Sequence, residues 1–237
     1  MIEKRFNELY SRAYEKGYPC YTDFLNIDEQ SILENTFLPC IKYGGYPAAE
    51  RIIAAFGESI AYDDFPICIL NIKPSSKKFA DKLTHRDFLG GLMNLGIKRE
   101  LIGDIIINNN EGYVFCIEQI KNYIADNLTR IKHTTVNVSQ LKELPDGIIK
   151  EPESIEAITA SLRLDAVISA VFKLSRSESA KLFRQEKVFV NSRASANGSY
   201  KIKDNDIISV RGFGRLQFLQ QLRTTKKDRI VIEIIKY

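Results

Sequence analysis

The chain has 237 residues, of which 44% are hydrophobic and 27% charged, a composition typical of a globular protein with room for more than one domain. Its four cysteines are scattered and it has only two histidines, which argues against a disulfide framework and a histidine-rich metal site. It has no apolar run of membrane-spanning length, and its amino terminus lacks the apolar core of a signal peptide. We therefore expect a cytoplasmic protein with reduced thiols, no metal and no cofactor.

The charge is unevenly distributed along the chain. Residues 161–237 contain sixteen Lys and Arg against seven Asp and Glu, a net charge of +9, whereas residues 1–160 carry a net charge of −5. A basic end beside an acidic remainder is typical of a protein that binds a polyanion through one part of its surface. The carboxy-terminal third is therefore predicted to hold a nucleic-acid site.

The first 64 residues are predicted to form a mixed helical region. An amphipathic helix is expected over residues 6–16 and a second helix ending near residue 37, followed by a short strand at residues 41–43. Residues 48–56, with the sequence AAERIIAAF, fit a helix by propensity. A strand is the open alternative there, because packing against neighbours overrides propensity.

Residues 65–143 are predicted to form a central domain. The expected order is strand, helix, two strands joined by a hairpin turn, helix and strand, over residues 67–72, 84–95, 104–107, 113–117, 118–129 and 134–138. This β-α-β-β-α-β order is that of ferredoxin-like and RNA-recognition-motif folds. The glycine-rich RNA motif is absent around Tyr113 and Phe115, so Phe115 is predicted to be a core residue and not a base-stacking one.

Residues 144–160 contain a proline-glycine turn and an acidic, proline-bearing stretch, and they are predicted to be a linker. The basic domain follows over residues 161–237. It is predicted to contain two short helices, a small sheet and a long hairpin over residues 218–235. Lys226, Lys227 and Arg229 add positive charge at the exposed tip of that hairpin.

The second helix of the basic domain is predicted to separate charged from buried side chains. Ser175 and Glu178 have the spacing of a capping box, which begins the helix. The apolar side chains of the helix point toward a core. The opposite side presents four cations, Arg176, Lys181, Arg184 and Lys187.

Five stretches of the basic domain recur in one order and spacing: Arg163–Asp165, Leu174–Arg176, Lys187–Asn191, Asp206–Val210 and Arg211–Gly212. This pattern resembles the RNA-binding domain named after small-subunit ribosomal protein four, called the S-four domain below. Two positions depart from the family, which usually has glycine at positions 186 and 205, here Glu186 and Asn205. Asparagine tolerates a left-handed backbone, but glutamate does not, so the turn at Glu186 is expected to be remodelled.

Three further stretches lie ahead of the basic domain: Phe24–Asn26, Tyr43–Arg51 and His85–Asp104. Together with the basic domain they resemble the YlmH family of bacteria over nearly the whole chain. The resemblance implies a protein that binds the large ribosomal subunit. It also implies contact with ribosomal RNA and peptidyl-tRNA in the rescue of stalled complexes, and an association with cell-division gene neighbourhoods.

Charge and resemblance together give ten candidate RNA contacts, in which cations bind phosphates and two polar side chains donate or accept hydrogen bonds. They are Arg163, Ser175, Arg176, Lys181, Arg184, Lys187, Asn191, Arg193, Arg211 and Arg215. Asp165 is expected to cap its helix or to pair with Arg163. Possible secondary contacts are Arg51, His85, Arg86, Lys98 and Arg99. The favoured alternative is a tightly packed helix in which Arg86 pairs with Asp87.

The sequence thus predicts an α+β protein with a mixed amino-terminal region, a ferredoxin-like or RNA-recognition-motif-like central domain and an S-four-type domain. Its expected function is that of a non-enzymatic, monomeric protein that binds structured RNA without catalytic residues. One alternative is an RNA-modifying enzyme, although the glycine-rich loop of a methyltransferase and the catalytic domain of a pseudouridine synthase are not evident. The other alternative is a division-site adaptor that acts through protein contacts.

Overall fold

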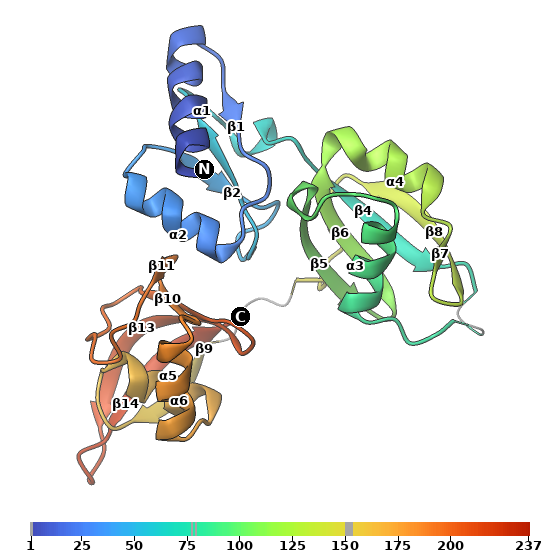
Figure 1. Ribbon diagram of the computed structural model, residues 1–237. Helices are drawn as coiled ribbons and strands as arrows, with labels where there is room; N and C mark the ends of the chain where they lie inside the picture. The colour runs from blue at the N-terminus through green and yellow to red at the C-terminus, as the bar shows by residue number, and fades with distance from the viewer. Residues whose placement is uncertain (1, 77, 79, 150–153) are drawn as a thin grey trace. The chain divides into compact units, whose positions relative to one another are not determined.

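The computed structural model is built on antiparallel sheets, and the apolar side chains of these sheets form the core (Figure 1). The structure describes residues 2–76, 78, 80–149 and 154–237. They form two units, one made of Met1–Asn26 and Phe37–Lys150, the other of Ile27–Thr36 and Glu151–Tyr237. Helices beside antiparallel sheets make the protein α+β, as predicted. None of the helices in the described ranges has both the length and the apolarity needed to cross a membrane.

The first unit contains a five-stranded sheet with the order β5-β6-β4-β8-β7. Its strands are β4 (Ile67–Pro74), β5 (Ile102–Asn108), β6 (Glu111–Ile117), β7 (Arg130–Ile131) and β8 (Thr134–Leu141), and all neighbours pair antiparallel. Helices α3 (His85–Asn94) and α4 (Lys121–Asn127) pack on one face (Figure 1). Strands β4, β5, β6 and β8 and the two helices follow one another in the predicted order along the chain.

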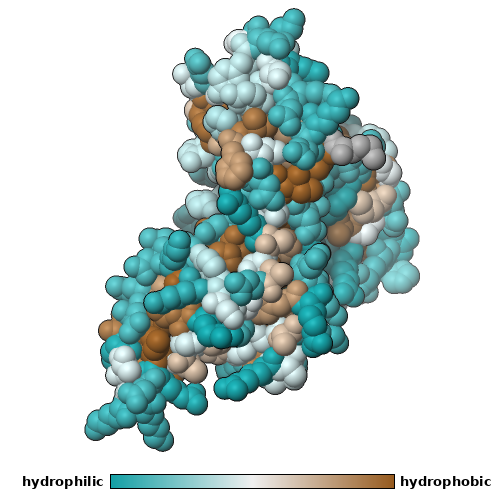
Figure 2. Space-filling model, turned by 60° about the vertical axis from the view of Figure 1, so that its left-hand side comes forward, coloured by the Kyte–Doolittle hydropathy of each residue, from teal (hydrophilic) through white to brown (hydrophobic). Residues whose placement is uncertain are grey.

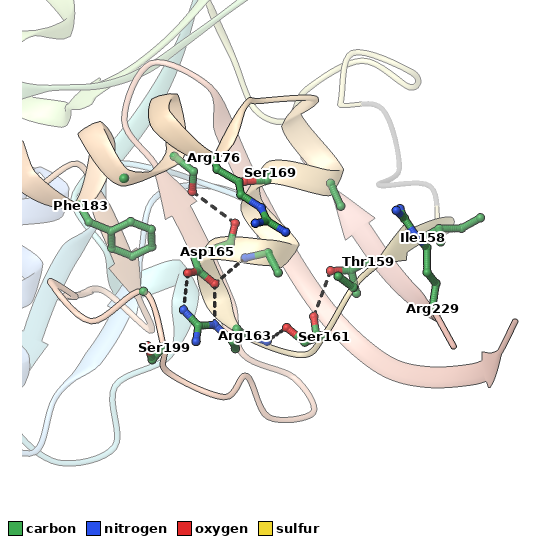
Figure 3. A pocket seen from close by; sticks show the side chains of 16 residues that line it. Ile158, Thr159, Ser161, Arg163, Asp165, Ser169, Arg176, Phe183, Ser199 and Arg229 are labelled. Atoms are coloured by element: carbon green, nitrogen blue, oxygen red, sulfur yellow. Dashed lines mark hydrogen bonds and ion pairs between the residues drawn. The ribbon is translucent and has the colours of Figure 1, made fainter. Parts of the chain in front are cut away.

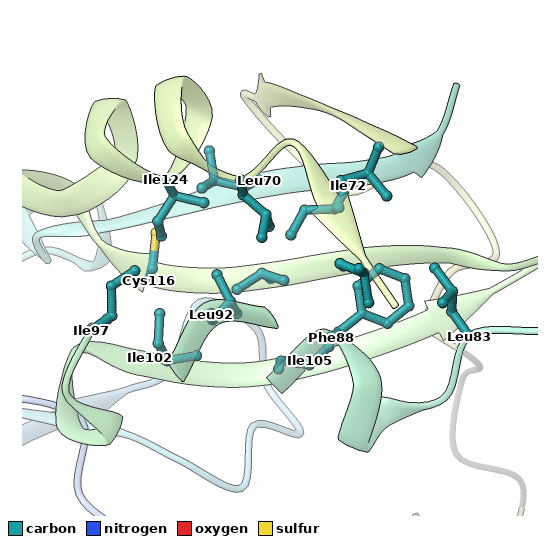
Figure 4. Close-up of a cluster of buried hydrophobic side chains, with 14 of the residues drawn as sticks. Leu70, Ile72, Leu83, Phe88, Leu92, Ile97, Ile102, Ile105, Cys116 and Ile124 are labelled. Carbon is teal, nitrogen blue, oxygen red and sulfur yellow. The ribbon is translucent and has the colours of Figure 1, made fainter. Parts of the chain in front are cut away.

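The core between this sheet and its helices is built from alternate strand residues and one stripe of each helix (Figure 4). Leu70 and Ile72 of β4 meet Phe88 of α3 and Ile124 of α4, and each is at most 1% exposed. A Cβ atom on Gly112 of β6 would lie 2.6 Å from the Phe88 ring. Only glycine therefore lets this ring approach the strand so closely.

The opposite face of the sheet is covered by the amino-terminal elements of the same unit. They include a small sheet of β1 (Cys20–Tyr21), β3 (Ile53–Phe56) and β2 (Ile41–Tyr43) in that order, and α1 (Ile2–Lys16) packs on this small sheet. Phe24, Ile53 and Phe65 pack there against Phe115 and Ile117 of β6. Phe115 is fully buried, so the prediction that it is a core residue is confirmed. Short 3-10 segments lie at Tyr62–Asp64, Arg99–Leu101 and Glu118–Ile120 of the same unit.

The second unit is a six-stranded antiparallel sheet with the order β11-β10-β12-β13-β14-β9. Its elements are α2 (Ile27–Thr36), β9 (Ser154–Thr159), α5 (Leu164–Phe172), α6 (Arg176–Arg184), β10 (Val188–Val190), β11 (Arg193–Ala194), β12 (Ile207–Val210), β13 (Gly214–Thr224) and β14 (Ile230–Lys236). Leu164 and Ile168 of α5 and Leu182 of α6 pack onto Phe218 and Ile232 of the sheet. This packing holds the helix pair against the sheet (Figure 1).

Two sequence predictions need correction, and one open question is answered. Of the two alternatives for residues 48–56, the strand is observed as β3, because all four residues of Ile53–Phe56 are buried and burial outweighs the helix propensity of alanine. The linker predicted at residues 144–160 contains β9, which pairs with β14 from Thr159 to Ser154. The amino-terminal region is not one piece, because α2 belongs to the second unit and packs on β11. Residues 150–153 of the predicted linker lie outside the described residues.

Candidate nucleic-acid interface

Helix α6 carries the cations on which the predicted interface depends, and its start is fixed by a capping box. The Ser175 oxygen accepts a hydrogen bond from the Glu178 amide at 3.2 Å, and the Glu178 carboxylate accepts from the Ser175 amide at 2.8 Å. The Ser175 hydroxyl also donates to that carboxylate at 2.7 Å, and these bonds lower the pKa of Glu178. The predicted capping box is confirmed, and it commits the Ser175 hydroxyl to the helix.

The cations of α6 point away from the core. Leu182 and Phe183 are buried beneath the helix, whereas Arg176, Lys181 and Arg184 are exposed. Toward every residue that the structure describes, the charged groups of these three side chains and of Lys187 form no ion pair or hydrogen bond. The helix therefore presents positive charge that the described part of the protein leaves uncompensated.

The end of α6 fixes where Lys187 begins the next strand. Glu186 has a positive φ of 52°, its amide donates to the Phe183 carbonyl at 3.1 Å, and the Lys187 amide donates to the Leu182 carbonyl at 3.0 Å. This pair of bonds is a Schellman motif, in which the left-handed residue is usually glycine. The expected remodelling of this turn is therefore wrong: the turn keeps its left-handed geometry with glutamate in it.

A hollow of about 880 Å³ opens between α5, α6, β9 and the segment around Ser199 (Figure 3). On its wall the Arg163 guanidinium donates to the two oxygens of the Asp165 carboxylate, from Nε at 3.1 Å and from Nη2 at 2.6 Å. This ion pair lowers the pKa of Asp165 and confirms the predicted pairing. Arg176 of α6 and Arg229 reach the same hollow from different elements. The sequence predicted Arg229 only as a charge at the hairpin tip. Its place in the hollow depends on the pairing of β9 with β14.

Asn191 lies in a two-residue turn between β10 and β11, where it and Ser192 both have positive φ. Its side-chain nitrogen donates to Asp206 at 2.8 Å, and its side-chain oxygen accepts from the Ile207 amide at 2.9 Å. Asp206 is 5% exposed and also accepts from the Tyr200 hydroxyl at 2.9 Å. The side chains of Asn191 and Ser175 are thus both committed to bonds within the domain.

The other three predicted cations have partners inside the second unit. Arg193 donates to the Glu34 carbonyl of α2 at 3.2 Å, and Arg211 forms an ion pair with Asp28 of the same helix. The Arg215 guanidinium lies 5.6 Å from the centre of the Tyr237 ring. The predicted set therefore divides into a group on α5 and α6 and a group held elsewhere in the unit. At the hairpin tip, the lowest part of Figure 2, the surface is hydrophilic and carries Lys226 and Lys227.

In the first unit, Arg51 and Asp104 join the three stretches that carry the wider sequence resemblance. The Asp104 carboxylate accepts from the Tyr46 hydroxyl at 2.8 Å and from the Arg51 amide at 3.1 Å. The Arg51 guanidinium donates to the Ile102 carbonyl at 3.0 Å and to the Phe24 carbonyl at 2.8 Å. These bonds stabilise the packing of the amino-terminal elements on the central sheet, which is a structural role.

Arg99 and His85 lie near the same cluster. Burial and the neighbouring Arg51 lower the pKa of Arg99 to about 10, and its guanidinium donates to the carbonyls of Ile102 and Gly103. Burial and Arg99 lower the pKa of His85. At neutral pH Arg99 therefore stays charged, whereas His85 stays neutral.

The remaining secondary candidates, Arg86 and Lys98, are exposed. The predicted pair of Arg86 with Asp87 is wrong, because the Asp87 carboxylate binds Lys132 at 2.8 Å and the Thr84 amide at 2.8 Å. Arg86 instead borders a hollow of about 370 Å³ between α3 and β7. Within the described ranges, no three His, Cys, Asp or Glu side chains are grouped so that they could hold a metal ion.

Comparisons with known proteins agree with the wider sequence resemblance. Residues 61–144 match the family model described as a putative RNA-binding domain in YlmH. The chain is 32% identical over 220 residues to the ribosome-associated protein quality control protein P2 of Bacillus subtilis (strain 168), covering 88% of this chain and 83% of that protein. The solved structure of the cell division protein YlmH from Streptococcus pneumoniae is 25% identical with a TM-score of 0.48, covering 59% of this chain and 88% of that one.

Proposed function

This chain belongs to the YlmH family, and from that premise we propose that it is a non-enzymatic protein that binds structured RNA at the ribosome. The relative from Bacillus subtilis is named as a ribosome-associated quality control protein, which supports a role beside stalled ribosomes. In finer terms, the proposed ligands are ribosomal RNA and tRNA on the large subunit, and the proposed location is the cytoplasm.

One observation carries the proposal: the cations of helix α6 are exposed and have no partner among the described residues. Like charges on one surface repel one another, so an array without counter-charges suits a polyanionic ligand. Arg176 also borders the hollow that Arg229 reaches, so positive charge continues from the helix into a concave surface. Phosphate groups that follow this surface would release counter-ions on binding.

We assign residues 161–237 to an S-four-type domain. Supporting this assignment are the helix pair α5 and α6 packed on a small antiparallel sheet, and the turns at Glu186 and Asn205, which both have positive φ where the family usually has glycine. The internal bonds of Ser175, Asn191 and Asp206 hold the helix start and the turns in place. In this proposal those residues shape the surface, while the cations of α6 and Lys187 bind phosphates.

The test removes two cations of α6 together, in the double variant Arg176→Ala, Arg184→Ala. The slope of log affinity against log salt is negative, and each lost phosphate contact makes it shallower by about 0.9. The affinity loss between about 50 and about 200 mM salt should then shrink roughly tenfold in the variant. The measurement is fluorescence anisotropy of labelled ribosomal RNA fragments and tRNA across a salt titration.

The matched control is Arg12→Ala, Lys16→Ala. This pair also removes from one helix two exposed cations that have no partner in the described part of the chain, but the helix is α1 of the first unit. The control should leave both the affinity and the salt slope unchanged. Equal salt slopes for the α6 variant, the control and the wild type would show that α6 does not contact the RNA.

Two further measurements separate the alternatives. Co-sedimentation with ribosomal subunits is expected for an RNA-binding protein and should be lost in the α6 double variant. A protein that neither sediments with subunits nor binds RNA would be an adaptor that acts through protein contacts.

The enzyme alternative is tested by incubating ribosomal RNA with the protein and adenosylmethionine, followed by mass analysis of nucleosides. No new modification is expected, and a modified nucleoside would show that the protein is an RNA-modifying enzyme.

A further inference from the structure

An aromatic patch with cations around it is built in the second unit from the turn between β12 and β13, the end of α5 and the end of β14. Its centre is Phe213, in the turn between β12 and β13, whose side chain is 44% exposed. The Phe213 ring lies 6.0 Å from the ring of Phe172, the last residue of α5, at an interplanar angle of 60°. Two elements far apart in sequence thus contribute neighbouring rings.

The backbone of the turn accounts for the exposure of Phe213. The Phe213 amide donates to the Val210 carbonyl at 2.9 Å, and Gly212 between them has a φ of 88°. Glycine at the third position of such a turn is the signature of type II geometry. The turn therefore holds Phe213 in a fixed place at the surface and not in a disordered loop.

Positive charge surrounds the rings. The Lys236 ammonium lies 5.4 Å from the centre of the Phe172 ring, and the Arg215 guanidinium lies 5.6 Å from the centre of the Tyr237 ring. Gly214 connects the two pairs, since a Cβ placed on it would lie 3.7 Å from the Tyr237 carbonyl oxygen and 3.9 Å from the Phe172 ring. The rings and the cations therefore form one continuous patch.

We propose that this patch binds an unpaired RNA base, which stacks on Phe213 while its phosphates contact Lys236 and Arg215. Aromatic rings among cations are the usual means of holding single-stranded nucleic acid, because every base has a π-face and every linkage a negative charge. The net charge of +9 over residues 161–237 favours a polyanion over an apolar protein partner. The inference rests on the proposed RNA-binding function and specifies which part of the RNA is recognised there: loops, bulges or ends, since paired bases are stacked within their own helix.

The test uses the absence of tryptophan from the chain. Phe213→Trp places a single indole in the patch, and stacking of a base on it quenches its fluorescence. The full-length variant is titrated with oligouridylate and, separately, with inorganic polyphosphate, which has the charge but no bases. The matched control is Leu222→Trp, a position on β13 of the same unit whose side chain is 39% exposed.

The expected result is that oligouridylate quenches the indole of the Phe213→Trp variant while polyphosphate does not, with little response from the Leu222→Trp control. Equal responses to the two polymers, or from the two variants, would overturn the proposal. A second variant measures affinity: Phe213→Ala should weaken binding of a single-stranded RNA roughly five- to a hundredfold, the range found for removing one stacking partner. Leu222→Ala should leave that affinity unchanged.

The outcomes also separate this inference from the proposed function. Where labelled RNA still binds and that binding depends on the cations of α6, an unquenched indole in the Phe213→Trp variant overturns the stacking proposal alone. A surface that binds an apolar protein partner would give the same unquenched result. Where no RNA binds to the wild type at all, the proposed function fails together with the inference that rests on it.

Discussion

Glu186 occupies the left-handed position at the end of helix α6, and its replacement by glycine tests the structure of the predicted interface. The residue is exposed, has a φ of 52° and follows the last turn of the helix. Glycine is the residue that this position of a Schellman motif favours. We expect Glu186→Gly to stabilise the second unit without changing its fold.

The size of this stabilisation follows from three contributions, two favourable and one opposing. A left-handed backbone costs a residue with a Cβ atom roughly 1–2 kcal/mol, which glycine avoids. Glycine loses more backbone entropy on folding, which offsets roughly 0.5–1 kcal/mol of that gain. Removing a carboxylate from the negative end of a helix adds about 0.3 kcal/mol at low ionic strength. The sum is about 1 kcal/mol, or about a fivefold change in the unfolding equilibrium.

The assay is amide hydrogen exchange of α6 and β10, which reports the second unit by itself. Protection of the slowest amides should rise about fivefold in Glu186→Gly. Glu186→Ala and Glu186→Gln lose the charge but keep the Cβ atom, so each should gain only a few tenths of a kcal/mol. If Ala stabilised the unit as much as Gly, the backbone argument would be refuted. Because all three variants remove a negative charge beside the cations of α6, all three should bind RNA more tightly.

Two further predictions concern the first unit. The bonds from Lys132 and Thr84 lower the pKa of Asp87 to about 2 from its usual value of 3.8, so its stabilising effect is present above about pH 4 and is lost as pH falls toward 2. Asp87→Asn should therefore lower the melting temperature at pH 7 but not at pH 2, and an equal effect at both would contradict the assignment. Gly103→Ala should destabilise the unit by about 1–3 kcal/mol in denaturant unfolding, since the new Cβ would lie 2.6 Å from the Phe24 ring. Gly90→Ala in α3 meets no atom within 4 Å and should instead stabilise it by up to about 1 kcal/mol.

Features of the structure that depend on near neighbours in sequence could be predicted. The capping box of Ser175 and Glu178 lies within four residues, and the ion pair of Arg163 with Asp165 spans three. Both depend on side chains that meet whatever the rest of the chain does. Phe115 could be predicted as a core residue for a different reason: its strand lacks the surrounding motif that would make it a base-stacking one.

Features that depend on distant pairing could not be predicted. Strand β9 reads as an acidic connector, and it becomes a strand only because β14 offers it an unpaired edge. The same pairing brings Arg229 to the hollow beside Arg163, a neighbour 66 positions away in sequence. The turn at Glu186 was misjudged for another reason. Propensity gives the cost of a left-handed glutamate, but not whether the flanking helix and strand hold the turn firmly enough to bear it.

The face of the five-stranded sheet opposite its helices is covered, and this limits which surfaces of the domain could contact RNA. In an RNA recognition motif that face stacks bases on exposed aromatic side chains. Here Phe115 lies beneath Phe24, and Gly103 lacks the Cβ atom that would keep the Phe24 ring away. Arg51 then bonds to the carbonyls of both Phe24 and Ile102, which ties the cover to the sheet. The first two of the stretches that carry the resemblance thus pack against the Ile102–Asp104 end of the third. With this face covered, an RNA contact of this domain would come from its helices and loops, through phosphates and shape.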